Sequence, residues 1–136
     1  METVSWSGAF SVNVKEIDEQ HRRFLRFLRE AYAKIGMQLK PGELNPLLDR
    51  LMEHANEHFA TEEKYFAEFK YEYGAHHIEL HEKIRTEIVE FRERHKNDLS
   101  ANLTWELVDF LENWLLDHVM KHDKLYMETF NAHGLY

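Results

Sequence analysis

The ten residues HANEHFATEE (54–63) place two histidines, an asparagine and three glutamates on a segment that otherwise has the pattern of a buried helix. Apolar residues recur around them every three or four positions, which is the period of an amphipathic α-helix. These residues are Leu44, Leu47, Leu48, Leu51, Ala55, Phe59, Phe66 and Phe69. With Asn45 as the cap and Pro46 at the first helical position, a helix is expected over about 46–70.

Helical phase separates the ionisable groups of this stretch. At about 100° per residue, Glu62 falls near the centre of the apolar face, His58 lies within that face and His54 lies near its edge. Glu57 and Glu63 fall outside the face and are expected to point to solvent. Burying an unpaired carboxylate costs on the order of several kcal/mol, so Glu62 requires a partner.

The rest of the chain has the same helical character. Its two prolines and five glycines fall between periodic segments, which indicates long helices with short connections. Asp18 is the expected cap of the first helix, after an N-terminal arm that contains Trp6 and Phe10. We therefore expect one all-α domain over 1–136, an up-down-up-down antiparallel four-helix bundle with a short C-terminal tail. The expected helices are about 18–38, 46–70, 75–96 and 103–121.

Composition excludes several classes of function. A formal net charge of −8 argues against a nucleic-acid surface and is compatible with a monomer. The absence of cysteine rules out disulfides, thiolate metal sites and cysteine catalysis. The N-terminus lacks a signal-peptide pattern, and no apolar stretch approaches the roughly 20 residues that span a membrane. A cytoplasmic protein without a membrane partner is expected.

Histidine is over-represented, with ten residues in 136, roughly three times an ordinary share. Helical phase places His21 on the apolar face of the first helix, His77 and His81 on that of the third, and His118 on that of the fourth. The separation of 37 residues between His21 and His58 recurs between His81 and His118, which can bring these residues to a common height. Each histidine alone is more often a hydrogen-bonded core residue. Their joint pattern on all four helices favours one metal site that also satisfies the buried glutamate.

The fourth helix leaves two candidates for a further ligand. His122 lies one turn after His118 and would face the site in a regular α-helix. Asp123 lies five residues after His118, about 140° around an ideal helix. Geometry alone therefore favours His122.

Taken together, the motifs resemble the hemerythrin family, specifically its single-domain bacterial members. The resemblance runs from Trp6 to Asp123 and rests on four motifs in this order. They are SVNVKEIDEQH (11–21), HFATE (58–62), HIELH (77–81) and HVMKHD (118–123).

The resemblance implies a non-haem di-iron centre with seven protein ligands and a bridging oxo or hydroxo group. One iron would be held by His77, His81 and His118, the other by His21 and His58, and both would be bridged by Glu62 and Asp123. The family uses the aspartate five residues after the histidine, so the resemblance selects Asp123 over His122 and implies that the helix ends or distorts there. Counting ligands leaves one iron five-coordinate, and there the resemblance implies that O₂ is held reversibly as hydroperoxide.

The expected function is oxygen storage, delivery or scavenging, without enzymatic turnover. Phe24, Phe59, Trp114, Leu115 and Val119 neighbour the ligands and resemble the family's apolar O₂ pocket, although ordinary core packing explains each of them equally well. An oxygen or redox sensor, an iron-handling module and a di-iron enzyme acting on peroxide or nitrogen oxides remain alternatives. A zinc site fits less well, because zinc prefers four ligands. His54 is expected to lie near the site without joining it.

Overall fold

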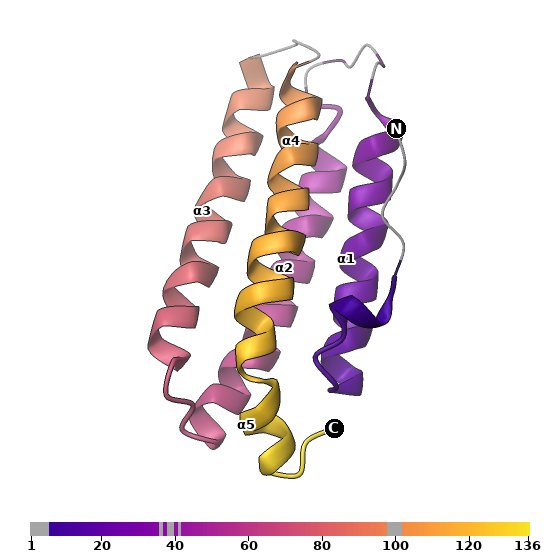
Figure 1. Ribbon diagram of the computed structural model, residues 1–136. Helices are drawn as coiled ribbons and strands as arrows, with labels where there is room; N and C mark the ends of the chain where they lie inside the picture. The colour runs from indigo at the N-terminus through magenta and orange to yellow at the C-terminus, as the bar shows by residue number, and fades with distance from the viewer. Residues whose placement is uncertain (1–5, 36, 38–39, 41, 98–101) are drawn as a thin grey trace.

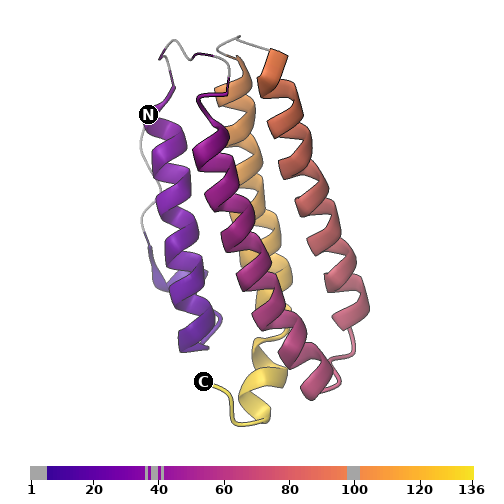
Figure 2. The same cartoon turned by 180° about the vertical axis from the view of Figure 1, so that it is seen from behind.

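Four long helices run alternately up and down and form a bundle, which Figures 1 and 2 show from opposite sides. A computed structural model describes residues 6–35, 37, 40, 42–97 and 102–136, without the side chains of 95–97, 102, 103 and 115. The predicted all-α antiparallel bundle is confirmed. In chain order the elements are η1 (Gly8–Phe10), α1 (Lys15–Ala33), α2 (Asn45–Glu68), α3 (Gly74–Asn97), α4 (Asn102–Asn113), η2 (Trp114–Asp123) and α5 (Met127–Ala132).

The first helix begins earlier than its sequence suggests. Helix α1 starts at Lys15 because the carbonyl of Val14 already accepts the N–H of Asp18 at 2.8 Å. Asp18 is therefore not the cap but lies in the first turn. Its carboxylate accepts hydrogen bonds from the Ser11 hydroxyl at 2.6 Å and the Val12 N–H at 2.8 Å, which ties the N-terminal arm to the helix. The helix ends at Ala33, and the predicted end at residue 38 lies outside the described residues.

The second helix also starts one residue before its predicted position. Leu44 holds the cap position, and its carbonyl accepts the N–H of Leu48 at 3.0 Å, so Asn45 is already helical. At the other end, Lys70 adopts a left-handed conformation with φ of 52°, and Tyr71 N–H donates to the Phe66 carbonyl at 3.0 Å. This closure satisfies carbonyls that the helix end would leave unpaired.

The fourth helix changes character along its length. The regular α-helix α4 ends at Asn113, and the chain continues as the π-helical segment η2 over Trp114–Asp123. A π-helix bonds each N–H to the carbonyl five residues back, so each turn holds more residues than an α-turn. The distortion that the family resemblance implied near Asp123 thus begins at Trp114, within the helix predicted over about 103–121.

Two apolar clusters fill the interior. The larger contains Phe24, Phe59 and Trp114, and the smaller contains Phe66 and Tyr126 near α5. On α1, His21 lies between Ile17 of the smaller cluster and Phe24 of the larger one, and on α2 Glu62 lies between Phe59 of the larger and Phe66 of the smaller. Within the described ranges, no helix carries an apolar stretch long enough to cross a bilayer.

Candidate metal centre

Seven buried polar side chains meet where the two apolar clusters adjoin. Each is at most 3% exposed, and every long helix of the bundle contributes at least one. Their potential ligand atoms form two groups, in each of which the atoms lie within 4.8 Å of one another. The first group is Glu62, His77, His81 and His118, and the second is His21, His58 and Asp123.

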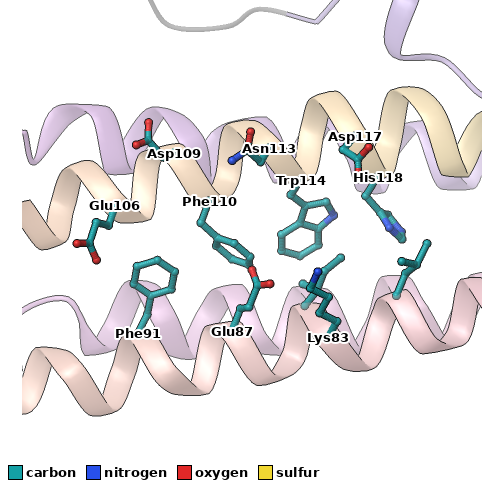
Figure 3. A pocket seen from close by; sticks show the side chains of 12 residues that line it. Lys83, Glu87, Phe91, Glu106, Asp109, Phe110, Asn113, Trp114, Asp117 and His118 are labelled. Atoms are coloured by element: carbon teal, nitrogen blue, oxygen red, sulfur yellow. The ribbon is translucent and has the colours of Figure 1, made fainter.

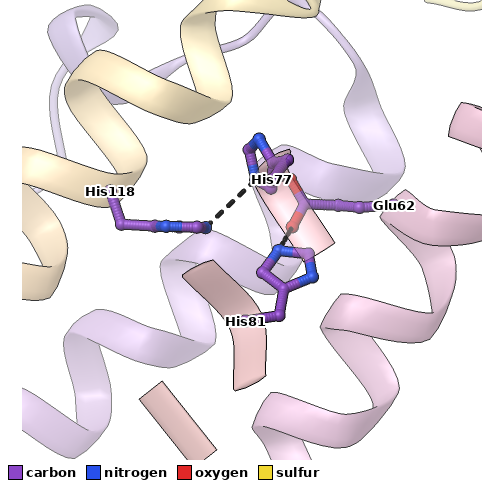
Figure 4. A group of neighbouring side chains, drawn as sticks. All are labelled: Glu62, His77, His81 and His118. Carbon is purple, nitrogen blue, oxygen red and sulfur yellow. Dashed lines mark hydrogen bonds and ion pairs between the residues drawn. The ribbon is translucent and has the colours of Figure 1, made fainter. Parts of the chain in front are cut away.

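The first group joins α2, α3 and η2, as Figure 4 shows. Nε2 of His77 lies 3.1 Å from Nε2 of His118. Nε2 of His81 lies 3.1 Å from Oε1 of Glu62. The three imidazoles therefore turn the same ring nitrogen toward one small volume.

The second group joins α1, α2 and η2. Nε2 of His21 lies 3.2 Å from Nε2 of His58 and 2.9 Å from Oδ2 of Asp123. His21 and His58 are one of the two pairs predicted to lie at a common height from a 37-residue separation, and the structure places them side by side.

The two carboxylates connect the groups. Asp123 directs Oδ2 to His21 and places Oδ1 2.8 Å from Nε2 of His77. Glu62 places Oε1 3.2 Å from Nε2 of His58 and 3.1 Å from Nε2 of His81. Each carboxylate therefore contacts imidazoles of both groups and lies between them.

The π-helical segment explains how Asp123 reaches the centre. Five residues make slightly more than one turn of a π-helix, so Asp123 and His118 lie on the same face. Nε2 of His118 lies 3.1 Å from Oδ1 of Asp123. The His122 side chain is instead partly exposed, and its Nε2 lies 3.7 Å from Oδ2 of Asp117. The structure thus places Asp123 in the cluster and His122 outside it.

His54 is buried next to the cluster but belongs to neither group. It is 7% exposed, and its ring stacks on that of His58 with centroids 6.0 Å apart. Burial, followed by the proximity of His58, lowers the pKa of His54 to about 3, so its ring is neutral.

Two supporting residues were missed by the sequence reasoning. Nδ1 of His58 lies 2.7 Å from Oε1 of Gln20, and Nδ1 of His81 lies 2.9 Å from Oε2 of Glu63. The prediction that Glu63 faces solvent is therefore wrong, since its carboxylate reaches back to His81. Helical phase could not find this contact because it depends on the position of a neighbouring helix.

Electrostatics distinguish the two carboxylates. Burial, and then the nearby charge of Asp123, raise the pKa of Glu62. Burial would also raise the pKa of Asp123, but His118, His21 and His58 outweigh it and hold that pKa well below its ordinary value. Asp123 is therefore the more acidic carboxylate of the pair.

Burial keeps two of the imidazoles neutral, whereas at His118 the charge of Asp123 outweighs burial and raises the pKa. Burial lowers the pKa of His81 to about 3, helped by His77 and His118. Burial also lowers the pKa of His58. A neutral imidazole has a free lone pair, which is the form that binds metal ions.

The donor set passes a test of fit to metal ions. Among the described residues, both Glu62 oxygens, Oδ1 of Asp123 and Nε2 of His81 are buried without a hydrogen-bond partner. Such atoms are rare in folded proteins because an unsatisfied buried group is costly. Cations between the two groups would satisfy them. Five imidazoles with two carboxylates suit a pair of transition-metal ions better than one four-coordinate zinc.

An apolar wall borders the cluster. Phe24, Phe59, Trp114 and Val119 are at most 4% exposed and share the larger core cluster. Phe59 stacks on His81 with ring centroids 3.8 Å apart. The side chain of Leu115, the fifth predicted pocket residue, lies outside what the structure describes.

A groove between α3 and α4 approaches the centre from the surface. It has a volume of about 520 Å³, and Trp114 and His118 line one end of it (Figure 3). Carboxylates such as Glu87 and Asp109 line the outer part of the groove.

The fold and the site together define a helical-bundle protein with a buried histidine–carboxylate centre whose two donor groups suit a pair of metal ions. Residues 12–130 match the hemerythrin HHE cation binding domain, so the chain belongs to the hemerythrin family.

Relatives of similar length support this membership. A bacteriohemerythrin of Stenotrophomonas maltophilia is 28% identical over 98% of this chain and 85% of that protein. A bacteriohemerythrin of Methylococcus capsulatus is 26% identical over 97% of this chain and 100% of that protein. The crystal structure of a hemerythrin point mutant superposes with a TM-score of 0.80 at 23% identity, covering 95% of this chain and 98% of that one. This structural likeness shows the shared fold.

Proposed function

We propose that the protein binds two iron ions at the buried centre and uses them to bind O₂ reversibly. His77, His81 and His118 would hold one ion and His21 and His58 the other, with Glu62 and Asp123 between them. The observation that carries the proposal is the set of buried, unpartnered oxygen and nitrogen atoms that meet between the two groups. When bound, two ferrous ions supply the two electrons that reversible O₂ binding requires.

The chain's own residues favour binding over turnover. Phe24, Phe59 and Val119 exclude water from one side of the centre and carry no group that could donate a proton. The imidazoles outnumber the carboxylates five to two, whereas oxygen-activating di-iron bundles hold their metals mainly with glutamates. Fewer anionic ligands stabilise the ferrous state, which supports an oxygen carrier.

The proposal is tested by loading the protein with iron and measuring the iron-to-protein ratio. We expect a ratio near two. After reduction, exposure to O₂ should produce visible charge-transfer bands that disappear when the sample is flushed with inert gas. Irreversible oxidation with product formation would indicate an enzyme or a sensor, and a ratio well below two would refute the di-iron assignment.

A matched pair of variants tests the placement of the ligands on α2. His58 and His54 are both buried and lie one turn apart, but only His58 joins a donor group. His58→Ala should abolish O₂ binding, and His54→Ala should leave the iron ratio and the spectrum largely intact. Equal damage from both variants would mean that the assignment of His58 is wrong.

A further inference from the structure

Two of the cluster's imidazoles form hydrogen bonds through Nδ1, on the side away from the centre, with groups of different charge. The Nδ1–H of His81 donates to the Glu63 carboxylate at 2.9 Å, and the Nδ1–H of His58 donates to the Gln20 amide oxygen at 2.7 Å. Each hydrogen bond fixes the ring tautomer, so the Nε2 lone pair faces the centre. The support behind His81 is an anion, whereas the support behind His58 is neutral.

The Gln20 amide is oriented by a short chain of hydrogen bonds. The hydroxyl of Thr61 donates to the carbonyl of Glu57 at 3.0 Å, so its oxygen is left to accept. Gln20 Nε2 donates to that oxygen at 3.0 Å. The Gln20 Oε1 is therefore the atom that accepts the hydrogen bond from His58. Every side chain in this series of hydrogen bonds is uncharged.

Glu63 is held by Arg85. The Arg85 Nη2 lies 3.7 Å from Oε2 of Glu63, and Arg85 Nε donates to the Asn56 side-chain oxygen at 2.9 Å. The guanidinium also lies 5.0 Å from the ring centre of Phe59, and the Phe59 ring stacks on that of His81. Arg85 therefore fixes both the carboxylate behind His81 and the aromatic ring beside it.

We infer that Glu63 is a positioning residue that acts through His81 and makes the two metal positions unequal in electron donation. This inference rests on the proposed function. A carboxylate that accepts the Nδ1 proton raises the basicity of the imidazole toward its metal, and a neutral amide does so less. The ion held by His81 is thereby stabilised in its higher oxidation state relative to the ion held by His58.

The decisive variant is Glu63→Gln, which keeps an acceptor for the Nδ1 proton but removes the charge. In the iron-loaded protein, the reduction potential measured by spectroelectrochemistry should rise. The Mössbauer signals of the two ferric ions should become more alike, because both supporting groups are then amides. Glu57→Gln is the matched control, since it removes the same charge from an exposed position on the same helix and should move neither readout.

A second variant, Glu63→Ala, removes the acceptor as well. In the metal-free protein, ¹⁵N NMR should show His81 as the single Nδ1–H tautomer in the wild type and in Glu63→Gln, and as a tautomer mixture in Glu63→Ala. Iron affinity should fall about 10- to 100-fold in Glu63→Ala. Glu63 is partly exposed, so both variants keep the core intact, which circular dichroism checks.

The outcomes separate this inference from the proposed function. The positioning role is overturned if Glu63→Gln leaves the reduction potential unchanged, or if Glu63→Ala leaves the tautomer of His81 unchanged. A protein that fails to bind two irons overturns the proposed function instead, while the NMR measurement on the metal-free protein still decides the contact between Glu63 and His81.

Discussion

Replacing Glu62 by glutamine should stabilise the metal-free protein while removing its ability to hold metal. Glu62 is fully buried, both of its carboxylate oxygens lack a hydrogen-bond partner among the described residues, and burial raises its pKa. Glutamine has nearly the same shape as the protonated side chain but cannot ionise. The variant therefore removes the cost of a buried charge without leaving a cavity.

The expected magnitude follows from the desolvation of that carboxylate. An unsatisfied buried polar group is costly and a charged one more so, and we take the extra cost of an ionised Glu62 over the neutral glutamine amide as about 1–3 kcal/mol. For a chain of this length, each kcal/mol corresponds to about 4 °C in Tm, so Glu62→Gln should melt about 4–12 °C higher. The raised pKa of Glu62 sets the direction of the pH effect on wild-type stability. Protonated Glu62 contributes its full stabilisation below the ordinary glutamate pKa, and this stabilisation is lost as the pH rises through the folded-state pKa. The difference between variant and wild type should therefore grow toward alkaline pH.

The assay is thermal unfolding followed by circular dichroism at several pH values, on chelator-treated protein and on protein loaded anaerobically with ferrous iron. Iron should reverse the order of stability, because a metal that binds only the folded state stabilises the wild type and not the variant. Glu57→Gln, exposed on the same helix, should melt like the wild type. A metal-free Glu62→Gln protein that is less stable than the wild type at alkaline pH would refute this reasoning.

Three further changes probe the scaffold. Phe59→Ala removes a fully buried ring stacked on His81 and should cost about 3–5 kcal/mol in urea unfolding, and a loss below about 1 kcal/mol would contradict its place in the core. Lys70→Gly relieves a left-handed residue and should gain about 1 kcal/mol in the same assay, whereas a loss would mean that the lysine side chain has a role of its own. Asn131→Ala breaks the side-chain bond from Asn13 and the bonds that Asn131 donates to the carbonyls of Asn13 and Leu135; amide exchange near Asn13 should accelerate, and unchanged exchange would show that these bonds do not hold the arm.

The bundle and the inward-facing histidines could be predicted because helical period is a local property. The apolar spacing around His58 and Glu62 fixes which groups face inward whatever the neighbouring helices do. The equal separations of 37 residues also predicted which histidines of neighbouring helices lie at the same height in the bundle. For these residues the sequence carried the geometry directly.

Other features depend on bonds that no periodicity describes. Assuming 100° per residue turned Asp123 away from the centre, and only the family resemblance indicated otherwise, because the change to π-helical bonding has no signature in residue spacing. Asp18 looked like a cap because its side chain does bond to the backbone, yet its partners lie in the arm before the helix. The role of Glu63 depends on the packing of α3 against α2, because that packing brings His81 next to Glu63.

The π-helical segment links the geometry of the candidate centre to the backbone hydrogen bonding of the fourth helix. Asp123 contacts both donor groups, and it does so only while η2 keeps five-residue bonding. A slip of this segment to α-register would turn Asp123 about 140° from His118 and withdraw it from both groups in one step. The winding of η2 therefore decides whether Asp123 contacts the two donor groups, so the backbone hydrogen bonding of this segment is part of the site.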